Sequence, residues 1–252
     1  MYVVRKFSYS IVMFLFQTTM AASYDGGLPQ SSLKQSLGEG YYQAEKLSEE
    51  VRPEIEKYAR VFHEDPDLME AVIFPELIRF NSIFDAIQIG SLITLYTRWG
   101  DDYADFSVGY FQMKPSFAEQ IERSALEFAD FGWVTRAGFS GLKTTNDFEG
   151  RKLRIERLRS LTWQVKYLGA FLKICRSRYR IRKINVEYNV RLLATAYNAG
   201  YHRTLKKTTP FLSKKLFYTG QMDNGSRFNY SSIAWLRFNE LKMRRKALRV
   251  AI

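Results

Sequence analysis

The sequence predicts a mainly α-helical protein, and three observations favour that class. Apolar residues recur at helical spacing from residue 41 onward, without a convincing run of the alternation that marks β-strands. The chain of 252 residues holds only 6 Pro and 15 Gly, too few for an all-β protein rich in turns. It is also 46% hydrophobic and 15% aromatic, so it can bury a sizeable core and is not a disordered protein.

The N-terminus predicts export. Arg5 and Lys6 precede an apolar run over residues 7–16, and small residues follow at positions 19–23. This order is typical of a secretory signal peptide, and the run is too short for a confident membrane span. We therefore expect a signal peptide over residues 1–22, with an uncleaved N-terminal anchor as the alternative.

One domain is expected behind this signal. Residues 23–40 are rich in Gly, Ser and Gln and predict a flexible leader, and residues 41–252 predict the helical domain with additional N- and C-terminal helices. A small β-hairpin is allowed between Trp99 and Gly109. Apolar periodicity and helix-start residues predict helices over residues 41–64, 67–80, 83–99, 115–131, 148–180, 186–198 and 231–249.

The net charge, the single cysteine and the two histidines exclude fewer functions than the N-terminus does. Lys and Arg total 38 against 26 acidic residues, a formal charge of +12, which attracts polyanions of every kind. The basic stretches can equally be the solvated faces of helices. Cys175 is the single cysteine and can form no intrachain disulfide, and His63 and His202 lack metal-ligand spacing, so we expect neither a metal nor a cofactor.

The first candidate site is Glu76, which lies among apolar residues near the end of a predicted helix. Burial next to apolar groups disfavours the charged form of a carboxyl group and raises its pKa. A raised pKa is what a general acid needs in order to protonate a leaving oxygen at neutral pH. The alternative is an ordinary helix glutamate or a partner of Arg79.

Two further segments contain residues suited to sugar binding. Gly109 permits close backbone approach, Gln112 can donate and accept hydrogen bonds, and Pro115 suits the start of a helix. Later, Tyr197 and Asn198 precede Ala199-Gly200 at a helix end. By themselves these segments equally suit a plain turn and a helix C-cap.

Taken in order, the three segments resemble the lytic transglycosylases, members of the lysozyme-like superfamily that cleave bacterial peptidoglycan. That family has a helix-end Glu, then Gly-x-x-Gln-x-x-Pro, then Tyr-Asn-Ala-Gly. The resemblance covers about residues 60–205 and departs from the family at Leu77, where a small polar residue is usual. Pro75 also precedes Glu76, and a predicted helix over residues 83–99 lengthens the gap to the second segment. Glu70 is the alternative acid.

The resemblance implies a lysozyme-like fold and cleavage of the β-1,4 bond between N-acetylmuramic acid and N-acetylglucosamine. Glu76 would act as acid and then as base toward the 6-hydroxyl, closing a 1,6-anhydro ring, with assistance from the N-acetyl group. Tyr197 would hydrogen-bond and orient Glu76. Substrate contacts are implied for the second and third segments, at Gly109, Tyr110, Phe111, Gln112 and Asn198. The aromatic residues among them can equally be core residues.

The implied partner is the peptidoglycan glycan strand, without nucleic acid, and with the membrane only through an uncleaved signal. We expect a monomer in the periplasm or cell envelope of a bacterium. Two alternatives stay open. A hydrolytic muramidase would use a second carboxylate from among Asp101, Asp102 and Asp105, and a wall-binding scaffold protein would retain the fold without activity.

Overall fold

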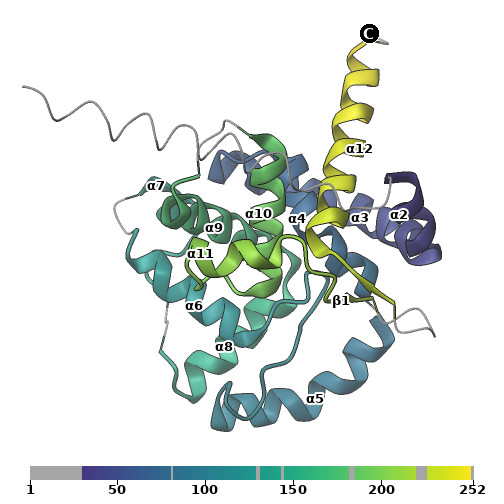
Figure 1. Cartoon of the computed structure of the whole chain (residues 1–252). Helices are drawn as coiled ribbons and strands as arrows, with labels where there is room; N and C mark the ends of the chain where they lie inside the picture. The colour runs from purple at the N-terminus through teal and green to yellow at the C-terminus, as the bar shows by residue number, and fades with distance from the viewer. Residues whose placement is uncertain are drawn as a thin grey trace, which may run out of the picture.

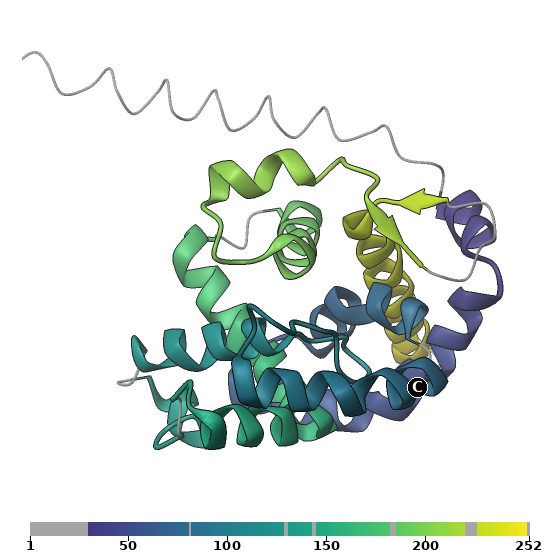
Figure 2. The same cartoon turned by 90° about the horizontal axis from the view of Figure 1, so that it is seen from below.

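The computed structural model describes residues 30–80, 82–128, 131–142, 145–181, 185–219 and 226–250. Side chains are described for this part except at residues 30 and 82–89. The described part is mainly α-helical, with eleven helices and one two-stranded antiparallel hairpin, which confirms the predicted class (Figures 1 and 2). The predicted signal peptide lies outside the described residues.

The helices and strands follow one another along the chain with short connections. They are α2 (Gln30–Leu37), α3 (Glu39–Phe62), α4 (Pro66–Arg79), α5 (Ser82–Trp99), α6 (Pro115–Leu126), α7 (Gly132–Arg136), α8 (Phe148–Arg159), α9 (Leu161–Tyr179), α10 (Val186–Ala199), α11 (Leu205–Thr208), a 3-10 turn (Thr209–Phe211), β1 (Phe217–Tyr218), β2 (Arg227–Phe228) and α12 (Tyr230–Val250). No helix in these ranges is both long and apolar enough to cross a bilayer.

Helix α4 is enclosed by the rest of the fold. It packs against α3, α10 and α12, and every residue from Asp67 to Ile78 is buried. The helix begins at Pro66, where a missing N–H costs nothing, and the Asp65 side chain accepts a hydrogen bond of 2.9 Å from the backbone N–H of Asp67. A carboxylate carried on such a helix is withdrawn from water.

The long helix expected over residues 148–180 is two helices, α8 and α9. Ser160 between them has an extended backbone, with φ −92° and ψ 121°. A short polar residue favours such helix boundaries, and the break lets both helices bury an apolar face against each other. Helix α9 holds the central place predicted for this stretch, because it packs against α3, α6, α8 and α10.

The hairpin lies elsewhere than the sequence allowed for. Strand β1 pairs with β2, with Phe217 opposite Phe228, near the C-terminus. Between Trp99 and Gly109 the described backbone forms a turn after Gly100 and irregular structure, followed by one isolated bridge from Val108 to Met113. Helix α5 ends before Gly100, whose φ is 91°, and Arg151 of α8 donates hydrogen bonds to the carbonyls of its last turn.

Residues 30–40 differ from the flexible leader that the sequence predicts. Helix α2 covers most of them, and Leu33 and Leu37, spaced by one helical turn, are buried in the core. Lys34 also binds Glu240 of α12 at 3.0 Å. The Gly- and Ser-rich composition suggested a leader, but two correctly spaced leucines are enough to hold a short helix on the domain.

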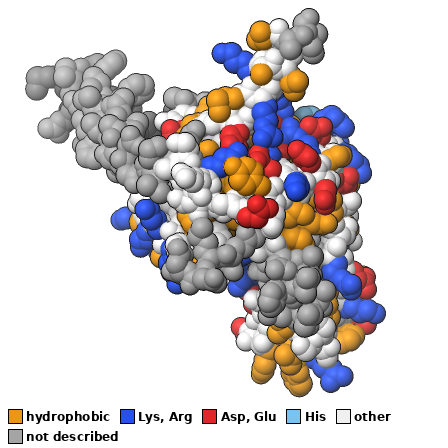
Figure 3. Space-filling model, turned by 90° about the vertical axis from the view of Figure 1, so that its right-hand side faces the viewer, with side chains coloured by type: hydrophobic (Ala, Val, Ile, Leu, Met, Phe, Trp, Pro, Cys, Tyr) orange, Lys and Arg blue, Asp and Glu red, His pale blue; other side chains and the backbone are white. Residues whose placement is uncertain are grey.

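Helix α12 closes the fold from the C-terminal side. Its first part is buried against α4 and α10, whereas its last turns project from the body (Figure 1). On the face seen in Figure 3, acidic and basic side chains lie side by side beneath this projecting end. The charge of +12 is therefore not gathered into one uniform patch on that face.

Candidate active site

Glu76 lies in the last turn of α4 and is 3% exposed. The burial that its apolar neighbours predict is confirmed, and the helix continues to Arg79 despite Pro75. Burial raises the pKa of Glu76 to about 7, because a carboxylate loses its hydration there, and the positive charge of Arg79 opposes the shift. Glu76 therefore has the protonation behaviour of a general acid at neutral pH.

Arg79 is the charged neighbour of this carboxyl group. Its Nη2 lies 2.6 Å from Oε2 of Glu76, and its guanidinium lies over the Phe217 ring at 5.4 Å from the centroid. Oε2 itself is buried and receives no hydrogen bond of good geometry from any described residue. Glu76 is therefore both a buried carboxyl group with a raised pKa and the ion-pair partner of Arg79.

The second segment forms a tight turn across from this helix end. Val108 and Met113 exchange backbone hydrogen bonds of 3.0 and 3.2 Å, and the turn between them places both Gly109 and Gln112 at positive φ, 69° and 47°. Gln112 donates from Nε2 to the carbonyl of Gly109 at 2.9 Å. In this structure the Gln112 amide therefore stabilises its own turn.

Gln164 of helix α9 binds the backbone of this turn. The Gln164 side chain accepts from the backbone N–H of Phe111 at 2.9 Å and donates to the Leu158 carbonyl at 2.6 Å. A Cβ at position 109 would lie 1.8 Å from Nε2 of Gln164, so only glycine fits there. Gly109 acts here by letting the backbone approach Gln164.

The aromatic residues of the turn have different surroundings. The Phe111 ring is fully buried and belongs to the core, which is the alternative that the sequence left open. Tyr110 is half-buried, and its ring lies 4.8 Å from that of Phe80, the residue that follows α4. Tyr110 therefore joins the turn to the helix end that carries Glu76.

Tyr197 of α10 joins the third segment to the second. Its hydroxyl donates to the Phe111 carbonyl at 2.7 Å, whereas the family resemblance implies a hydrogen bond to Glu76; the single phenol proton is taken by that carbonyl. The ring is nonetheless close to Glu76: burial, and then the Glu76 charge, raises the pKa of Tyr197 well above its usual range. Asn198, the next residue, is exposed.

Sequence reasoning missed Tyr230, the first residue of α12. Its hydroxyl donates to the Val72 carbonyl of α4 at 3.0 Å, and its side chain lies close enough to Glu76 for the two groups to affect each other's pKa. Burial, and then the Glu76 charge, raises the pKa of Tyr230 well above its usual range. No local signal marks this tyrosine, because only the packing of α12 on α4 brings it to the site.

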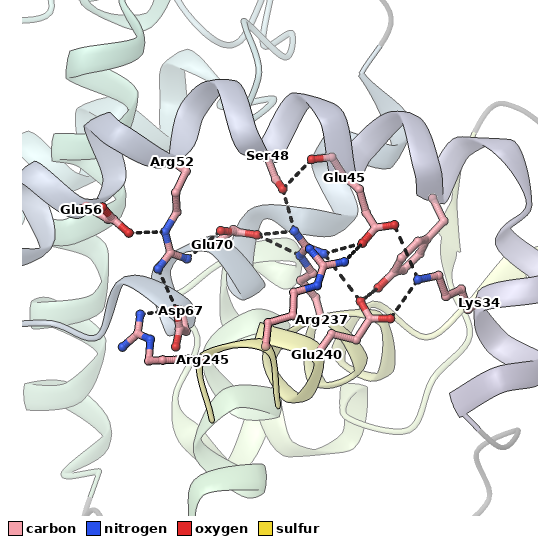
Figure 4. A network of polar contacts seen from close by, with 12 residues as sticks. Lys34, Glu45, Ser48, Arg52, Glu56, Asp67, Glu70, Arg237, Glu240 and Arg245 are labelled. Atoms are coloured by element: carbon pink, nitrogen blue, oxygen red, sulfur yellow. Dashed lines mark hydrogen bonds and ion pairs between the residues drawn. The ribbon is translucent and has the colours of Figure 1, made fainter. Parts of the chain in front are cut away.

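Glu70, the alternative acid, has a structural environment. It is buried on α4, but Nη1 of Arg52 binds one of its oxygens at 2.8 Å and Nε of Arg237 binds the other at 2.8 Å (Figure 4). Both carboxylate oxygens are thus occupied by charge-assisted hydrogen bonds from guanidinium groups of the protein itself. The geometry therefore favours Glu76.

The aspartates considered for a hydrolase lie in the turn region after α5. Asp105 accepts hydrogen bonds from the backbone N–H and the hydroxyl of Ser116, at 3.1 and 2.9 Å, and pairs with Lys114 at 3.3 Å. It thus anchors the start of α6 and is already engaged. Asp101 and Asp102 lie in the turn that follows Gly100, where Asp102 is exposed.

Neither a metal-binding group among the described residues nor a known relative identifies this site. Within the described ranges, no group of three or more His, Cys, Asp or Glu side chains is arranged to hold a metal ion. Comparison of the chain with protein-family models, with curated proteins and with solved structures finds no match. The site must therefore be interpreted from its own geometry.

Proposed function

We propose that this protein is a peptidoglycan lytic transglycosylase with a lysozyme-like fold and with Glu76 as its general acid and base. The observation that carries the proposal is the convergence of three segments far apart in the sequence. Tyr197 of the third segment binds the backbone of the second through Phe111, and Tyr197 lies within electrostatic reach of Glu76 of the first. These are the segments on which the family resemblance depends.

The environment of Glu76 suits the reaction. With a pKa of about 7, Glu76 carries its proton in a large fraction of molecules at neutral pH and can transfer it to the glycosidic oxygen. The bond from C1 to that oxygen then breaks, with the N-acetyl group of the substrate assisting, as in glycosidases that lack a carboxylate pair. The resulting carboxylate takes the proton of the 6-hydroxyl, and O6 bonds to C1.

Arg79 and the neighbouring segments supply supporting roles. The Arg79 side chain is about one-third exposed, and its charge stabilises the carboxylate that remains after proton transfer. We assign substrate contacts to the turn and to the end of α10, at Gly109, Tyr110, Phe111, Gln112 and Asn198, with Phe111 acting through its backbone. The partner is the glycan strand, and the protein acts as an exported monomer in the bacterial cell envelope.

The test is mass spectrometry of muropeptides released from purified sacculi by the protein without residues 1–22. We expect 1,6-anhydro-muropeptides from the native protein and none from Glu76→Gln, because the amide can neither donate nor take the proton. Glu127→Gln is the matched control, since Glu127 is exposed and pairs with Arg178 only at 3.7 Å. Reducing-end products from the native protein would instead indicate a hydrolase.

One observation favours a second candidate, a wall-binding protein without activity. The contact between Arg79 and Glu76 is that of an ion pair, which a non-catalytic descendant of the fold could keep for stability. That candidate predicts retention on sacculi without release of any muropeptide, both for the native protein and for Glu76→Gln.

A further inference from the structure

The last two turns of α12, residues 243–250, project from the body of the protein (Figure 1) and are called the projecting segment below. Met243, Leu248 and Val250 in this segment are 59%, 67% and 81% exposed, whereas Ile233 and Leu236 in the first turns of the same helix are buried. Large apolar side chains that stay in water are unfavourable, and several of them close together mark an interaction surface.

The projecting segment is also basic. It contains Arg244, Arg245, Lys246 and Arg249 and no acidic residue. Arg244 and Arg245 pair with carboxylates of the body, whereas Lys246 and Arg249 form no ion pair with any residue that the structure describes. Figure 3 shows hydrophobic and basic side chains together on this end of the molecule. The segment therefore attracts an anionic surface.

The two kinds of side chain follow neighbouring stripes of the helix. Met243, Ala247 and Val250 are spaced by four and three residues and share one face, and Lys246 and Arg249 are spaced by three and share the next. Leu248 lies outside both stripes. An apolar stripe beside a basic one is typical of helices that lie at the surface of a bilayer, with apolar side chains near the acyl chains and cations at the headgroups.

The size of the segment favours a membrane over a protein partner. Eight helical residues extend over roughly 12 Å, so a cylinder of helical width and this length has a surface of roughly 400 Å² even if all of it is covered. A stable protein interface buries about 800 Å² on each partner. A bilayer requires no matching shape, because the basic residues bind headgroups and the apolar side chains enter the interface independently.

We propose that the projecting segment docks the protein on an anionic lipid bilayer. Met243 and Val250 enter the boundary between headgroups and acyl chains, and Lys246 and Arg249 bind lipid phosphates. None of these residues belongs to the candidate active site, so the inference goes beyond the proposed function and does not depend on it. It adds a membrane contact where the sequence analysis expected one only through an uncleaved signal peptide.

The test is co-sedimentation of the protein with lipid vesicles. The protein without residues 1–22 is used, because the apolar run of the predicted signal peptide would itself bind lipid. Vesicles of equal parts phosphatidylglycerol and phosphatidylcholine are compared with vesicles of phosphatidylcholine alone. We expect binding to the anionic vesicles to be at least about tenfold tighter, and to weaken with added salt, because salt screens the attraction between basic residues and headgroups.

Reversal of charge tests the basic stripe. A basic residue near an anionic surface contributes about fivefold to affinity, so Lys246→Glu combined with Arg249→Glu is expected to weaken binding to the anionic vesicles by at least about 25-fold. Lys206→Glu combined with Lys207→Glu is the matched control, because these two lysines of α11 are exposed and the variant has the same net charge. We expect this control to weaken binding by less than about threefold.

A second variant tests the apolar stripe without changing the charge. Met243→Ser combined with Val250→Ser is expected to weaken binding to the anionic vesicles about tenfold, because less apolar surface leaves water on docking. Met243, Val250, Lys246 and Arg249 are all exposed, so both variants are expected to keep the urea unfolding midpoint of the native protein.

Three results would overturn the inference: no binding of the native protein to vesicles, equal binding to both kinds of vesicle, or equal losses in the α12 charge reversal and its α11 control. The vesicles contain no glycan, so these results are independent of the muropeptide assay. Absence of anhydro-muropeptides from the native protein would overturn the proposed function alone.

Discussion

At the scale of single residues, the burial of Glu76 lowers the stability of the folded protein when the carboxyl group is ionised. Its pKa rises from the ordinary 4.5 to about 7 in the folded protein, because burial removes water from the charged form. Below pH 4.5 the group is protonated in both the folded and the unfolded chain and has no effect on stability. Between these two values only the unfolded chain loses the proton, so the free energy of unfolding falls as pH rises.

This linkage predicts that Glu76→Gln stabilises the protein, and more so at higher pH. The shift of 2.5 units corresponds to about 3 kcal/mol, which is fully developed above pH 7 and absent below pH 4.5. The measurement is urea unfolding of the native protein and the variant at pH 5 and pH 8. A stability difference that does not grow between these two pH values would show that Glu76 titrates normally in the folded state.

At the scale of elements, the turn from Val108 to Met113 depends on one backbone contact. Gly109 lies against Gln164, and Gln164 fixes the Phe111 backbone to which Tyr197 is bound. The positions of these residues therefore depend on a chain of contacts that runs from α9 through the turn to α10. A side chain at position 109 would disturb each of these contacts.

We predict that Gly109→Ala destabilises the protein more than Gly141→Ala. Both glycines have positive φ, 69° and 76°, so both variants carry a similar backbone strain of about 1 kcal/mol. A Cβ at Gly141 meets no atom of the described residues within 4 Å, whereas one at Gly109 overlaps Gln164, which adds roughly 1–3 kcal/mol. Thermal unfolding compares the two, and equal losses would mean that Gln164 moves aside freely.

At the scale of elements, the periodicity of apolar residues also predicted some helix and strand positions wrongly. Seven helices were expected, and most start or end near an observed boundary, as for α10, which follows the expected range to within one residue. The expected helix ran through Ser160 because no Gly or Pro marks the boundary between α8 and α9. The hairpin was misplaced because its two short strands carry no alternating pattern long enough to detect.

At the scale of the whole molecule, a network of charged residues joins α12 to α3 and α4. Arg237 of α12 binds Glu70 of α4 and Glu45 of α3 at 2.8 and 2.9 Å, and Arg52 binds Glu70 from the other side (Figure 4). The Arg237 side chain is only 2% exposed. The network therefore joins α12 to α4, the helix that carries Glu76.

We predict that Arg237→Met destabilises the protein by about 3 kcal/mol, because it leaves buried carboxylates with one partner fewer. Arg244→Met is the matched control: Arg244 also binds Glu45, but it is half exposed, so its loss is expected to cost less than about 1 kcal/mol. Urea unfolding measures both, and activity on sacculi should fall with Arg237→Met alone. Equal stability of the two variants would show that the buried network is dispensable.

The sequence by itself determined the fold class, most helices and the burial of Glu76, because periodicity and an acidic residue among apolar ones are local features. It also placed Tyr197 and the Gly109 turn near Glu76, through the order of three short segments. Only the tertiary structure decided which hydrogen bonds those residues make. A phenol has one proton, and whether Phe111, Val72 or Glu76 receives it depends on packing between helices that are far apart in the chain.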